Sequence, residues 1–410
     1  MKAKIQIPKK DISGSLQLSG SKSISNRLLI IQALSGLYED LGNLSNSYDT
    51  KALARALSNP SPQINIGLAG TAMRFLTAFF AIQNRELVLT GDARMQERPI
   101  SDLVEALRFL GADISYQNKN GFPPLKIKGK ELEGGDLKIN SAVSSQFISA
   151  ILLIAPYLKN GIQLELQGEV LSRPYIEMTL SLMLKYGVKS TWIGDVITVS
   201  PGVYNPTEIK VESDWSSISY IFEIIALSDS GKITLSYVEE NSLQGDQRII
   251  EIFKSFGVRS SIKEGVLTLW KEPNFKLPSR LEFDCKATPD LAQTIAATAC
   301  GLGVQTKIKG LTNLPLKETN RLLALQTELG KCDAQVIIMN NEELEVLPVK
   351  DFPTTDLEFA TYQDHRMAMC LAPLAMCCNS VVIDDREVVN KSYRSYWEDL
   401  KILSFKVHLL

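Results

Sequence analysis

The sequence predicts an α/β protein that is built from a repeated unit. Along its 410 residues, a short apolar strand, a polar turn of small residues and an apolar helix follow one another six times. Five of these six copies recur at about 73 residues, a spacing too long for a solenoid repeat and long enough for a small α/β unit. Further helical patterns lie at 103–110 and 250–256. The alternation of strands and helices therefore indicates α/β layers.

Each expected helix follows a strand that ends in a turn of small polar residues. The strand-and-turn segments are 16–22, 65–70, 137–141, 208–213, 281–284 and 357–360, and the helices are 24–34, 71–82, 143–155, 215–227, 289–299 and 364–376. Helices that begin in such turns leave backbone N–H groups free and present the positive end of their dipole, so anions bind there readily. Simple capping of each helix is the alternative, and the crowding of unusual polar residues into the same turns favours binding.

Length, charge and cysteine usage narrow the class of protein. The length predicts two or three domains. Lys plus Arg total 44 and Asp plus Glu total 46, a balance that argues against nucleic-acid binding through bulk positive charge. The N-terminus lacks the apolar core of a signal peptide, and no apolar stretch is long enough to span a membrane, so we expect a cytoplasmic location. Two histidines and no C-x-x-C pair argue against a zinc site, and the six cysteines are expected to be packing residues.

The polar turns of the first half carry cations and hydroxyl groups. In GSKSISNR (20–27), Lys22 and Arg27 lie one turn apart with Ser23 between them, which suits a phosphate or carboxylate and equally a solvated helix end. The turn before Thr71 contains Gly70, and Arg98 follows within ARMQERP (93–99). Arg94 and Arg98 could reach an anion or pair with Asp92 and Glu97.

Two further turns of the first half are rich in hydroxyl groups. They contribute Ser144, Ser145, Gln146, Ser172 and Tyr175. Such groups suit a polyol better than a metal, and helix capping would also explain them.

The second half supplies carboxylates among cations. Asp290 follows Pro289 at a helix start, Glu318 stands in the compact run KETNR (317–321), and Asp364, His365 and Arg366 begin an otherwise apolar helix. Lys391 is a further candidate cation. Glu318 could shuttle a proton in a cationic cleft, or the run 317–321 could be an ordinary charged helix face with one weak ion pair. Helix capping would explain Asp364, but less readily His365 and Arg366 together.

Motifs of several common enzyme classes do not occur in the chain. It contains no G-x-S-x-G, no G-x-G-x-x-G and no Walker A sequence. Many cations, a few carboxylates, many hydroxyl groups and no cofactor motif suit an enzyme that joins two anionic metabolites by acid–base and electrostatic catalysis.

Nine of these short motifs occur in the order found in one enzyme family. They lie at 20–27, 70–74, 94–99, 144–146, 172–175, 244–246, 289–290, 317–321 and 364–369. With them the chain resembles the 5-enolpyruvylshikimate-3-phosphate synthase family. The resemblance implies transfer of the enolpyruvyl group of phosphoenolpyruvate to the 5-hydroxyl of 3-phosphoshikimate through a tetrahedral adduct, with release of phosphate. That reaction serves the shikimate pathway toward chorismate and the aromatic amino acids.

The resemblance also implies a fold and a division into domains. The expected fold is the inside-out α/β barrel of enolpyruvyl transferases, with two similar domains of three βαβαββ units each. One domain is expected at 22–212 and the other at 1–21 together with 213–410, with helix N-termini facing an interdomain cleft that holds the active site. The resemblance implies no cofactor and no metal, and small-molecule substrates are the only partners. We expect a monomer that binds neither nucleic acid nor membranes.

Individual roles follow from the resemblance, position by position. Lys22 is expected to contact both substrates and to take part in proton transfer, Asp290 to act as the base toward the 5-hydroxyl, and Glu318 to protonate the methylene carbon, with Lys22 as a competing proton donor. The expected 3-phosphoshikimate site comprises Lys22, Ser23, Arg27, Ser144, Ser145, Gln146, Ser172, Tyr175, Asp290, Asn313 and Lys317. The expected phosphoenolpyruvate site comprises Lys22, Gly70, Arg98, Gln146, Arg321, Arg366 and Lys391. His365 is expected near the reacting groups without an assigned role.

The chain departs from the family pattern at three positions. Leu68 stands where Asn is usual, Phe75 where Pro is usual, and Asn320 where Asp is usual. The first two should alter the packing behind the phosphoenolpyruvate site, which the inhibitor glyphosate occupies in the family.

Two other interpretations remain. The sister family that acts on UDP-N-acetylglucosamine usually carries a catalytic Cys in its N-terminal half and a Lys-Asn pair at its first helix. Here Cys285 is the first cysteine, and Lys22 is followed by Ser23. An inactive binding protein is the second alternative, and the joint presence of Lys22, Asp290, Glu318 and Arg366 argues against it.

Overall fold

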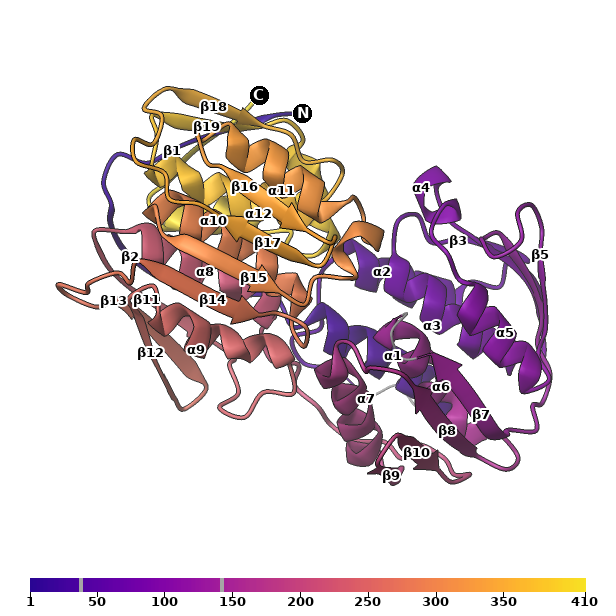
Figure 1. Ribbon diagram of the computed structural model, residues 1–410. Helices are drawn as coiled ribbons and strands as arrows, with labels where there is room; N and C mark the ends of the chain where they lie inside the picture. Colours follow the sequence, from indigo (N-terminus) through magenta and orange to yellow (C-terminus); the bar gives the residue numbers. More distant parts are fainter. Residues whose placement is uncertain (37–39, 141–143) are drawn as a thin grey trace. The chain divides into compact units, whose positions relative to one another are not determined.

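The computed structural model describes residues 1–36, 40–140 and 144–410 (Figure 1). The chain divides into two compact units, which are Gly20–Val211 and the combination of Met1–Ser19 with Glu212–Leu410. The second unit therefore contains both ends of the chain, and the first is inserted into it.

In the unit Gly20–Val211, the described residues form two four-stranded sheets and the helices that connect their strands. Its elements are α1 (Lys22–Ser35), α2 (Tyr48–Ser58), β3 (Gln63–Asn65), α3 (Gly70–Ala81), β4 (Glu86–Thr90), α4 (Ala93–Gln96), α5 (Ser101–Phe109), β5 (Asp113–Tyr116), β6 (Leu125–Lys128), β7 (Gly135–Asn140), α6 (Ser145–Ile154), η1 (Ala155–Tyr157), β8 (Ile162–Gln167), α7 (Arg173–Lys185), β9 (Ser190–Ile193) and β10 (Val196–Val199). The sheets have the orders β3-β4-β6-β5 and β7-β8-β10-β9.

The other unit contains three sheets. Its elements are β1 (Ala3–Gln6), β2 (Asp11–Leu16), α8 (Trp215–Leu227), β11 (Ser230–Ser236), η2 (Gly245–Arg248), α9 (Ile249–Lys254), β12 (Val258–Lys263), β13 (Val266–Lys271), β14 (Arg280–Asp284), η3 (Pro289–Leu291), α10 (Ala292–Leu302), β15 (Gln305–Lys309), η4 (Leu314–Leu316), α11 (Arg321–Gly330), β16 (Val336–Met339), β17 (Glu343–Val346), β18 (Asp356–Phe359), α12 (His365–Leu371), η5 (Ala372–Met376), β19 (Ser380–Ile383), η6 (Arg386–Lys391), α13 (Tyr396–Ile402) and β20 (Lys406–Leu409). The sheet orders are β12-β13-β11-β2, β14-β15-β17-β16 and β18-β19-β1-β20.

The five sheets formed by the described residues share one topology. A parallel pair of strands, such as β3 with β4 or β14 with β15, is extended by two antiparallel strands. Parallel neighbours need a crossover connection, and the apolar helices supply it. The N-terminal segment completes two of the sheets, because β2 pairs with β11 and β1 lies between β19 and β20. These repeated units confirm the α/β fold that the sequence predicts.

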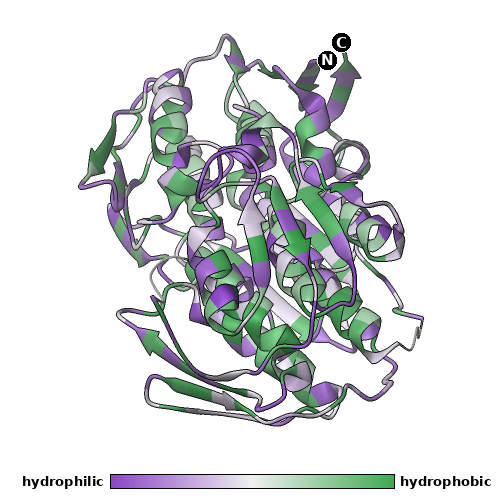
Figure 2. Ribbon diagram, turned by 90° about the vertical axis from the view of Figure 1, so that its right-hand side faces the viewer, coloured by the Kyte–Doolittle hydropathy of each residue, from purple (hydrophilic) through white to green (hydrophobic). Residues whose placement is uncertain are grey.

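The helices that connect the parallel strands form the interior of each unit, and the sheets lie around them. Every residue of α8 except Ser216 is buried, and α3 and α6 are buried almost throughout. A helix that is buried on all sides belongs in a core. The strands instead alternate between buried and exposed residues, so each sheet has one face toward the helices. Figure 2 shows hydrophobic colour over much of several helices and alternating colour along many strands.

The predicted helices agree closely with the observed ones, with two informative differences. The helix expected at 215–227 is found with those bounds. For the helix expected at 143–155, position 143 lies outside the described segments, and the observed helix α6 begins at Ser145. The helix expected at 364–376 is divided into α12 and η5, because Pro373 has no N–H and its ring obstructs an α-helical turn. Pro289 likewise starts a 3-10 turn before α10.

Candidate active site

Lys22 stands at the start of α1 and pairs with a buried carboxylate. The N-cap Ser21 accepts a hydrogen bond from the backbone N–H of Ile24, and Lys22 Nζ lies 3.4 Å from Asp49 Oδ2. Asp49 is 2% exposed and lies in the first turn of α2. Sequence reasoning missed Asp49, although an acidic residue just after the helix cap Ser47 is a signal that could have identified the helix start.

Arg27 is buried and joins three helices, so the alternative of a solvated helix end is wrong for this residue. Its guanidinium donates to Thr179 Oγ1 at 2.7 Å, to Ser149 Oγ at 3.0 Å, and to the carbonyl oxygens of Ser23 and Tyr175 at 2.9 and 3.0 Å. Burial lowers the pKa of Arg27 to about 10, which leaves it cationic at neutral pH.

Phe75, one of the departures from the family pattern, packs against this cation. The guanidinium of Arg27 lies 5.4 Å from the centre of the Phe75 ring. Such a contact favours the charged form of an arginine over the ring face. The substituted position therefore supports a residue of the candidate site.

Gly70 and Arg98 meet at the start of α3. A Cβ atom on Gly70 would lie 2.6 Å from Arg98 Nη1, so the guanidinium of Arg98 rests directly on the backbone of this turn. Arg74 donates to the carbonyl oxygens of Gly70 and Pro99 at 3.2 and 3.1 Å, which ties the turn to the segment that carries Arg98. Arg94 forms an exposed ion pair with Glu97 at 2.9 Å, so the solvated-face alternative is correct for Arg94.

The hydroxyl-rich turns lie at the starts of α6 and α7. Ser144 caps α6 by accepting from the backbone N–H of Gln146, and Gln146 Nε2 donates to Thr71 Oγ1 of α3 at 3.3 Å. Ser145 is the first residue of α6 and is partly exposed. Ser172 precedes α7 with a φ of 54° and makes no side-chain cap, so its hydroxyl is not explained by capping.

In the other unit, one arginine holds three carboxylates together. Arg321 Nη1 lies 3.1 Å from Asp290 Oδ1, its Nη2 lies 3.1 Å from Glu318 Oε2, and its Nε lies 2.7 Å from Asp364 Oδ2. The side chain of Arg321 is only 2% exposed. A guanidinium presents several donors in a fixed plane, which suits this multiple pairing.

The alternative that residues 317–321 form an ordinary charged helix face is wrong. The helix α11 begins only at Arg321, with Asn320 as its N-cap accepting from the backbone N–H of Leu323. Asn and Asp cap helices about equally well, so this departure from the family pattern keeps its local function. Glu318 therefore stands before the helix, where it can turn toward Arg321.

Asp290 is surrounded by cations. Besides Arg321, its carboxylate lies 2.8 Å from Arg366 Nη2 and 3.7 Å from Lys317 Nζ. Burial by itself would raise the pKa of Asp290, but the charges of Arg366, Lys317 and Arg321 outweigh it and hold the pKa well below its usual range. Asp290 is therefore ionised at neutral pH, and its 18% exposure leaves it within reach of a ligand.

The pKa values of two cations around Asp290 are shifted as well. Burial lowers the pKa of Lys317 despite the attraction of Asp290. For Arg321, burial would lower the pKa, but Asp364, Glu318 and Asp290 together raise it above its ordinary value. The guanidinium is thus a fixed positive charge, whereas the ammonium of Lys317 holds its proton less tightly.

Glu318 is placed between two cations. Its Oε1 lies 2.9 Å from Lys391 Nζ, and its Oε2 contacts Arg321. Asn313 precedes η4 in the same segment as Lys317, and its Oδ1 is buried without a hydrogen-bond partner in the residues that the structure describes. The cluster therefore contains a carboxylate in contact with proton-bearing groups and an amide oxygen that a ligand could engage.

Asp364 is a buried partner of Arg321 in this cluster. From the sequence it was assigned only a capping role. It is fully buried, caps α12 by accepting from the backbone N–H of Arg366 at 2.9 Å, and binds Arg321 through both carboxylate oxygens. His365 is 2% exposed, with Nδ1 3.5 Å from Asp364 Oδ1. The charged triplet that was conspicuous in the sequence is thus almost wholly buried.

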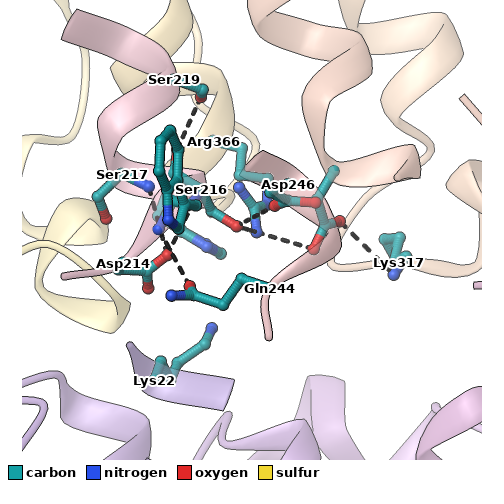
Figure 3. A network of polar contacts seen from close by, with 12 residues as sticks. Lys22, Asp214, Ser216, Ser217, Ser219, Gln244, Asp246, Lys317 and Arg366 are labelled. Atoms are coloured by element: carbon teal, nitrogen blue, oxygen red, sulfur yellow. Dashed lines mark hydrogen bonds and ion pairs between the residues drawn. The ribbon is translucent and has the colours of Figure 1, made fainter. Parts of the chain in front are cut away.

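The remaining polar helix start belongs to α8, where Asp214 is the N-cap. Its Oδ1 accepts from the backbone N–H groups of Ser216 and Ser217, and Gln244 accepts from that of Trp215 at 3.0 Å (Figure 3). The motif 244–246 therefore packs against the first turn of α8.

The described residues contain neither a metal-binding cluster nor a membrane-spanning helix. Within 1–36, 40–140 and 144–410, no group of three or more His, Cys, Asp or Glu side chains could hold a metal ion. No helix in those ranges combines the length and the apolar character needed to cross a membrane. All six cysteines are free thiols, four of them buried, in agreement with the predicted packing role.

The helix-cored α/β units, with ionised carboxylates held among cations, define an enzyme with the enolpyruvyl transferase fold. The family model for EPSP synthase (3-phosphoshikimate 1-carboxyvinyltransferase) matches residues 54–400. The chain therefore belongs to the EPSP synthase family.

Individual relatives agree with this assignment. A 3-phosphoshikimate 1-carboxyvinyltransferase from Bacteroides fragilis is 44% identical over 406 residues, which cover 97% of this chain and 96% of the relative. One from Shewanella pealeana is 33% identical and covers 97% of this chain and 98% of the relative. The fold is similar to that of an EPSP synthase structure from Acinetobacter baumannii, with a TM-score of 0.76 and 20% identity across all of both chains.

Proposed function

We propose that this protein transfers the enolpyruvyl group of phosphoenolpyruvate to the 5-hydroxyl of 3-phosphoshikimate and releases phosphate, as a step of the shikimate pathway. The observation that carries the proposal is the contact of Asp290 and Glu318 with one arginine, Arg321, in a chain of the EPSP synthase family. A carboxylate that can accept a proton and one that can donate a proton are what an addition–elimination reaction needs.

Asp290 is the proposed base. In the absence of substrates its pKa is held down by Arg366, Lys317 and Arg321, which makes it a weak base. The phosphate and carboxylate groups of the substrates would compete for these cations, and each cation withdrawn from Asp290 raises its pKa. Asp290 would therefore gain basicity only when both anions are bound. It then takes the proton of the 5-hydroxyl as the oxygen attacks C2 of phosphoenolpyruvate.

Glu318 is the proposed proton donor to the methylene carbon, with Lys22 as the competing donor. Protonation of C3 as the C–O bond forms at C2 gives a tetrahedral adduct. Loss of phosphate from C2 and return of a C3 proton to the donor restore the double bond, so the donor ends in its starting state. The proton that Asp290 took from the 5-hydroxyl leaves with the phosphate. Lys391, 2.9 Å from Glu318, could supply the proton that an ionised Glu318 must first acquire.

The cations and hydroxyl groups of the unit Gly20–Val211 are proposed to bind the substrates. Lys22, Ser23, Arg27, Ser144, Ser145, Gln146, Ser172 and Tyr175 would serve 3-phosphoshikimate together with Asp290, Asn313 and Lys317. Lys22, Gly70, Arg98 and Gln146 would serve phosphoenolpyruvate together with Arg321, Arg366 and Lys391. We expect variants in either unit to lose turnover, because both sets act on one pair of substrates. The domain ranges 22–212 and 1–21 with 213–410, the cytoplasmic location and the monomeric state belong to the same proposal.

Phosphate release tests the proposal directly. Purified protein should release phosphate when 3-phosphoshikimate and phosphoenolpyruvate are supplied together, and not when either is omitted. Turnover with UDP-N-acetylglucosamine in place of 3-phosphoshikimate would instead identify the sister activity. Binding of both ligands without phosphate release would identify an inactive binding protein.

A further inference from the structure

Asp246 is a buried carboxylate for which neither the sequence motif nor the proposed reaction has a role. It lies in η2 and is 2% exposed. Its Oδ2 accepts a hydrogen bond from Ser216 Oγ at the start of α8. Its Oδ1 is buried and has no hydrogen-bond partner in the part of the chain that the structure describes. A half-satisfied buried carboxylate is costly for a fold to keep, so a functional reason for it is worth seeking.

A short polar path leads from Asp246 to Asp290. Ser216 donates its one hydroxyl proton to Asp246, and its oxygen lies 3.3 Å from Arg366 Nη2. The same Arg366 nitrogen lies 2.8 Å from Asp290 Oδ2. Figure 3 shows Ser216 between Asp246 and Arg366, with dashed lines along this path. Arg366 therefore contacts Asp290 directly and is linked to Asp246 through the hydroxyl group of Ser216.

The charges around Asp246 couple it to the proposed base. Burial raises the pKa of Asp246 to about 6, the charges of Asp290 and Asp214 raise it as well, and Arg366 and the hydrogen bond from Ser216 lower it. Cys285 also lies close enough for its thiol to be influenced by Asp246. Coupling between two charges is mutual. A negative charge on Asp246 therefore favours the protonated form of Asp290, which makes Asp290 a stronger base.

We propose that Asp246 is a positioning residue for enolpyruvyl transfer, which orients Arg366 through Ser216 and, when ionised, strengthens Asp290 as the base. This inference rests on the proposed function. Because three cations hold down the basicity of Asp290, a nearby negative charge is the feature that would offset them. Asp246 supplies that charge from behind Arg366, where it does not compete for the substrate.

The pH dependence of kcat/KM separates this role from simple structural support. Asp246→Asn keeps the shape and the hydrogen-bond acceptor but cannot ionise. We expect it to lower the plateau of kcat/KM about threefold to tenfold and to remove the part of the acidic limb near pH 6 that belongs to the protein. Ser216→Ala removes the hydrogen bond that favours the ionised form, so the limb should move to higher pH. The phosphates of the substrates titrate in the same range, but identically for every variant.

Asp399→Asn is the matched control. Asp399 is also a buried carboxylate, it accepts from Ser395 Oγ at 2.8 Å, and burial raises its pKa. We expect Asp399→Asn to leave the pH profile unchanged. If the wild-type protein turns over and the profiles of Asp246→Asn and Ser216→Ala match its own, the inference is wrong. If Asp246→Asn does not fold, the test rests on Ser216→Ala: an acidic limb of kcat/KM at higher pH supports the inference, and an unmoved or lower limb contradicts it. Failure of the wild-type protein to release phosphate would instead refute the proposed function.

Discussion

Replacement of Gly70 by alanine tests whether the start of α3 positions Arg98 for phosphoenolpyruvate. The added Cβ would lie 2.6 Å from Arg98 Nη1 and 3.1 Å from its Cζ. An ordinary contact needs about 3.4 Å or more, so the guanidinium must move by roughly 0.8 Å. Because the obstructing atoms are the end of a long side chain, we expect the fold to tolerate the change. A misplacement of about 1 Å at a binding group can cost on the order of 100-fold.

We therefore expect Gly70→Ala to raise the KM for phosphoenolpyruvate about 10-fold to 100-fold, or about 1.4–2.7 kcal/mol, with a much smaller change in the KM for 3-phosphoshikimate. Steady-state phosphate release with each substrate varied in turn measures both constants. Gly202→Ala is the control in the same unit, because a Cβ there meets nothing within 4 Å. An unchanged KM for phosphoenolpyruvate in Gly70→Ala would refute the reasoning that Arg98 must rest on this backbone.

Three further predictions concern the carboxylates. Asp290→Asn and Glu318→Gln should each lower kcat by about 100-fold or more while ligand binding by calorimetry stays within severalfold; a near-normal rate would remove the role of that residue. Asp364→Asn should lower the free energy of unfolding in urea by about 3 kcal/mol, because the buried guanidinium of Arg321 loses the one fully buried carboxylate among its three charged partners; an unchanged midpoint and slope would contradict this. Glu223 is fully buried on α8, neither of its carboxylate oxygens has a hydrogen-bond partner within the described residues, and burial raises its pKa well above the usual value. Its stabilising contribution is therefore complete below the unfolded-state pKa of about 4.3 and is lost as the pH rises toward the folded-state pKa. Glu223→Gln should thus raise the Tm at pH 8 by about 2–4 °C and have little effect at pH 4, and a pH-independent shift would show that ionisation is not the cause.

The repeated fold could be predicted from the sequence because the patterns that indicate its helices and turns lie in consecutive residues. Apolar runs of helical length and small polar turns mark α3, α6 and α8 almost to the residue. The signal weakens where a local rule is broken, as at Pro373, where one expected helix becomes two shorter segments.

The candidate site could be predicted from the sequence only in part. Lys22, Asp290, Glu318, Arg321 and Arg366 were found because they stand in motifs with unusual concentrations of charge. Their partners could not be found in this way, because burial and pairing depend on residues far apart in the chain. Nothing in the sequence near Asp364 indicates that it binds Arg321, 43 positions away.

The sequence by itself determined the family, the order of the elements and the chemical types of groups available, because motif identity and hydrophobic periodicity are properties of consecutive residues. Only the tertiary structure decided which of those groups meet. It buried Arg27 among three helices, laid Arg98 on Gly70 and surrounded Asp290 with three cations. Whether a carboxylate is a base, a cap or a support depends on the field of its neighbours, and that field exists only once distant segments pack together.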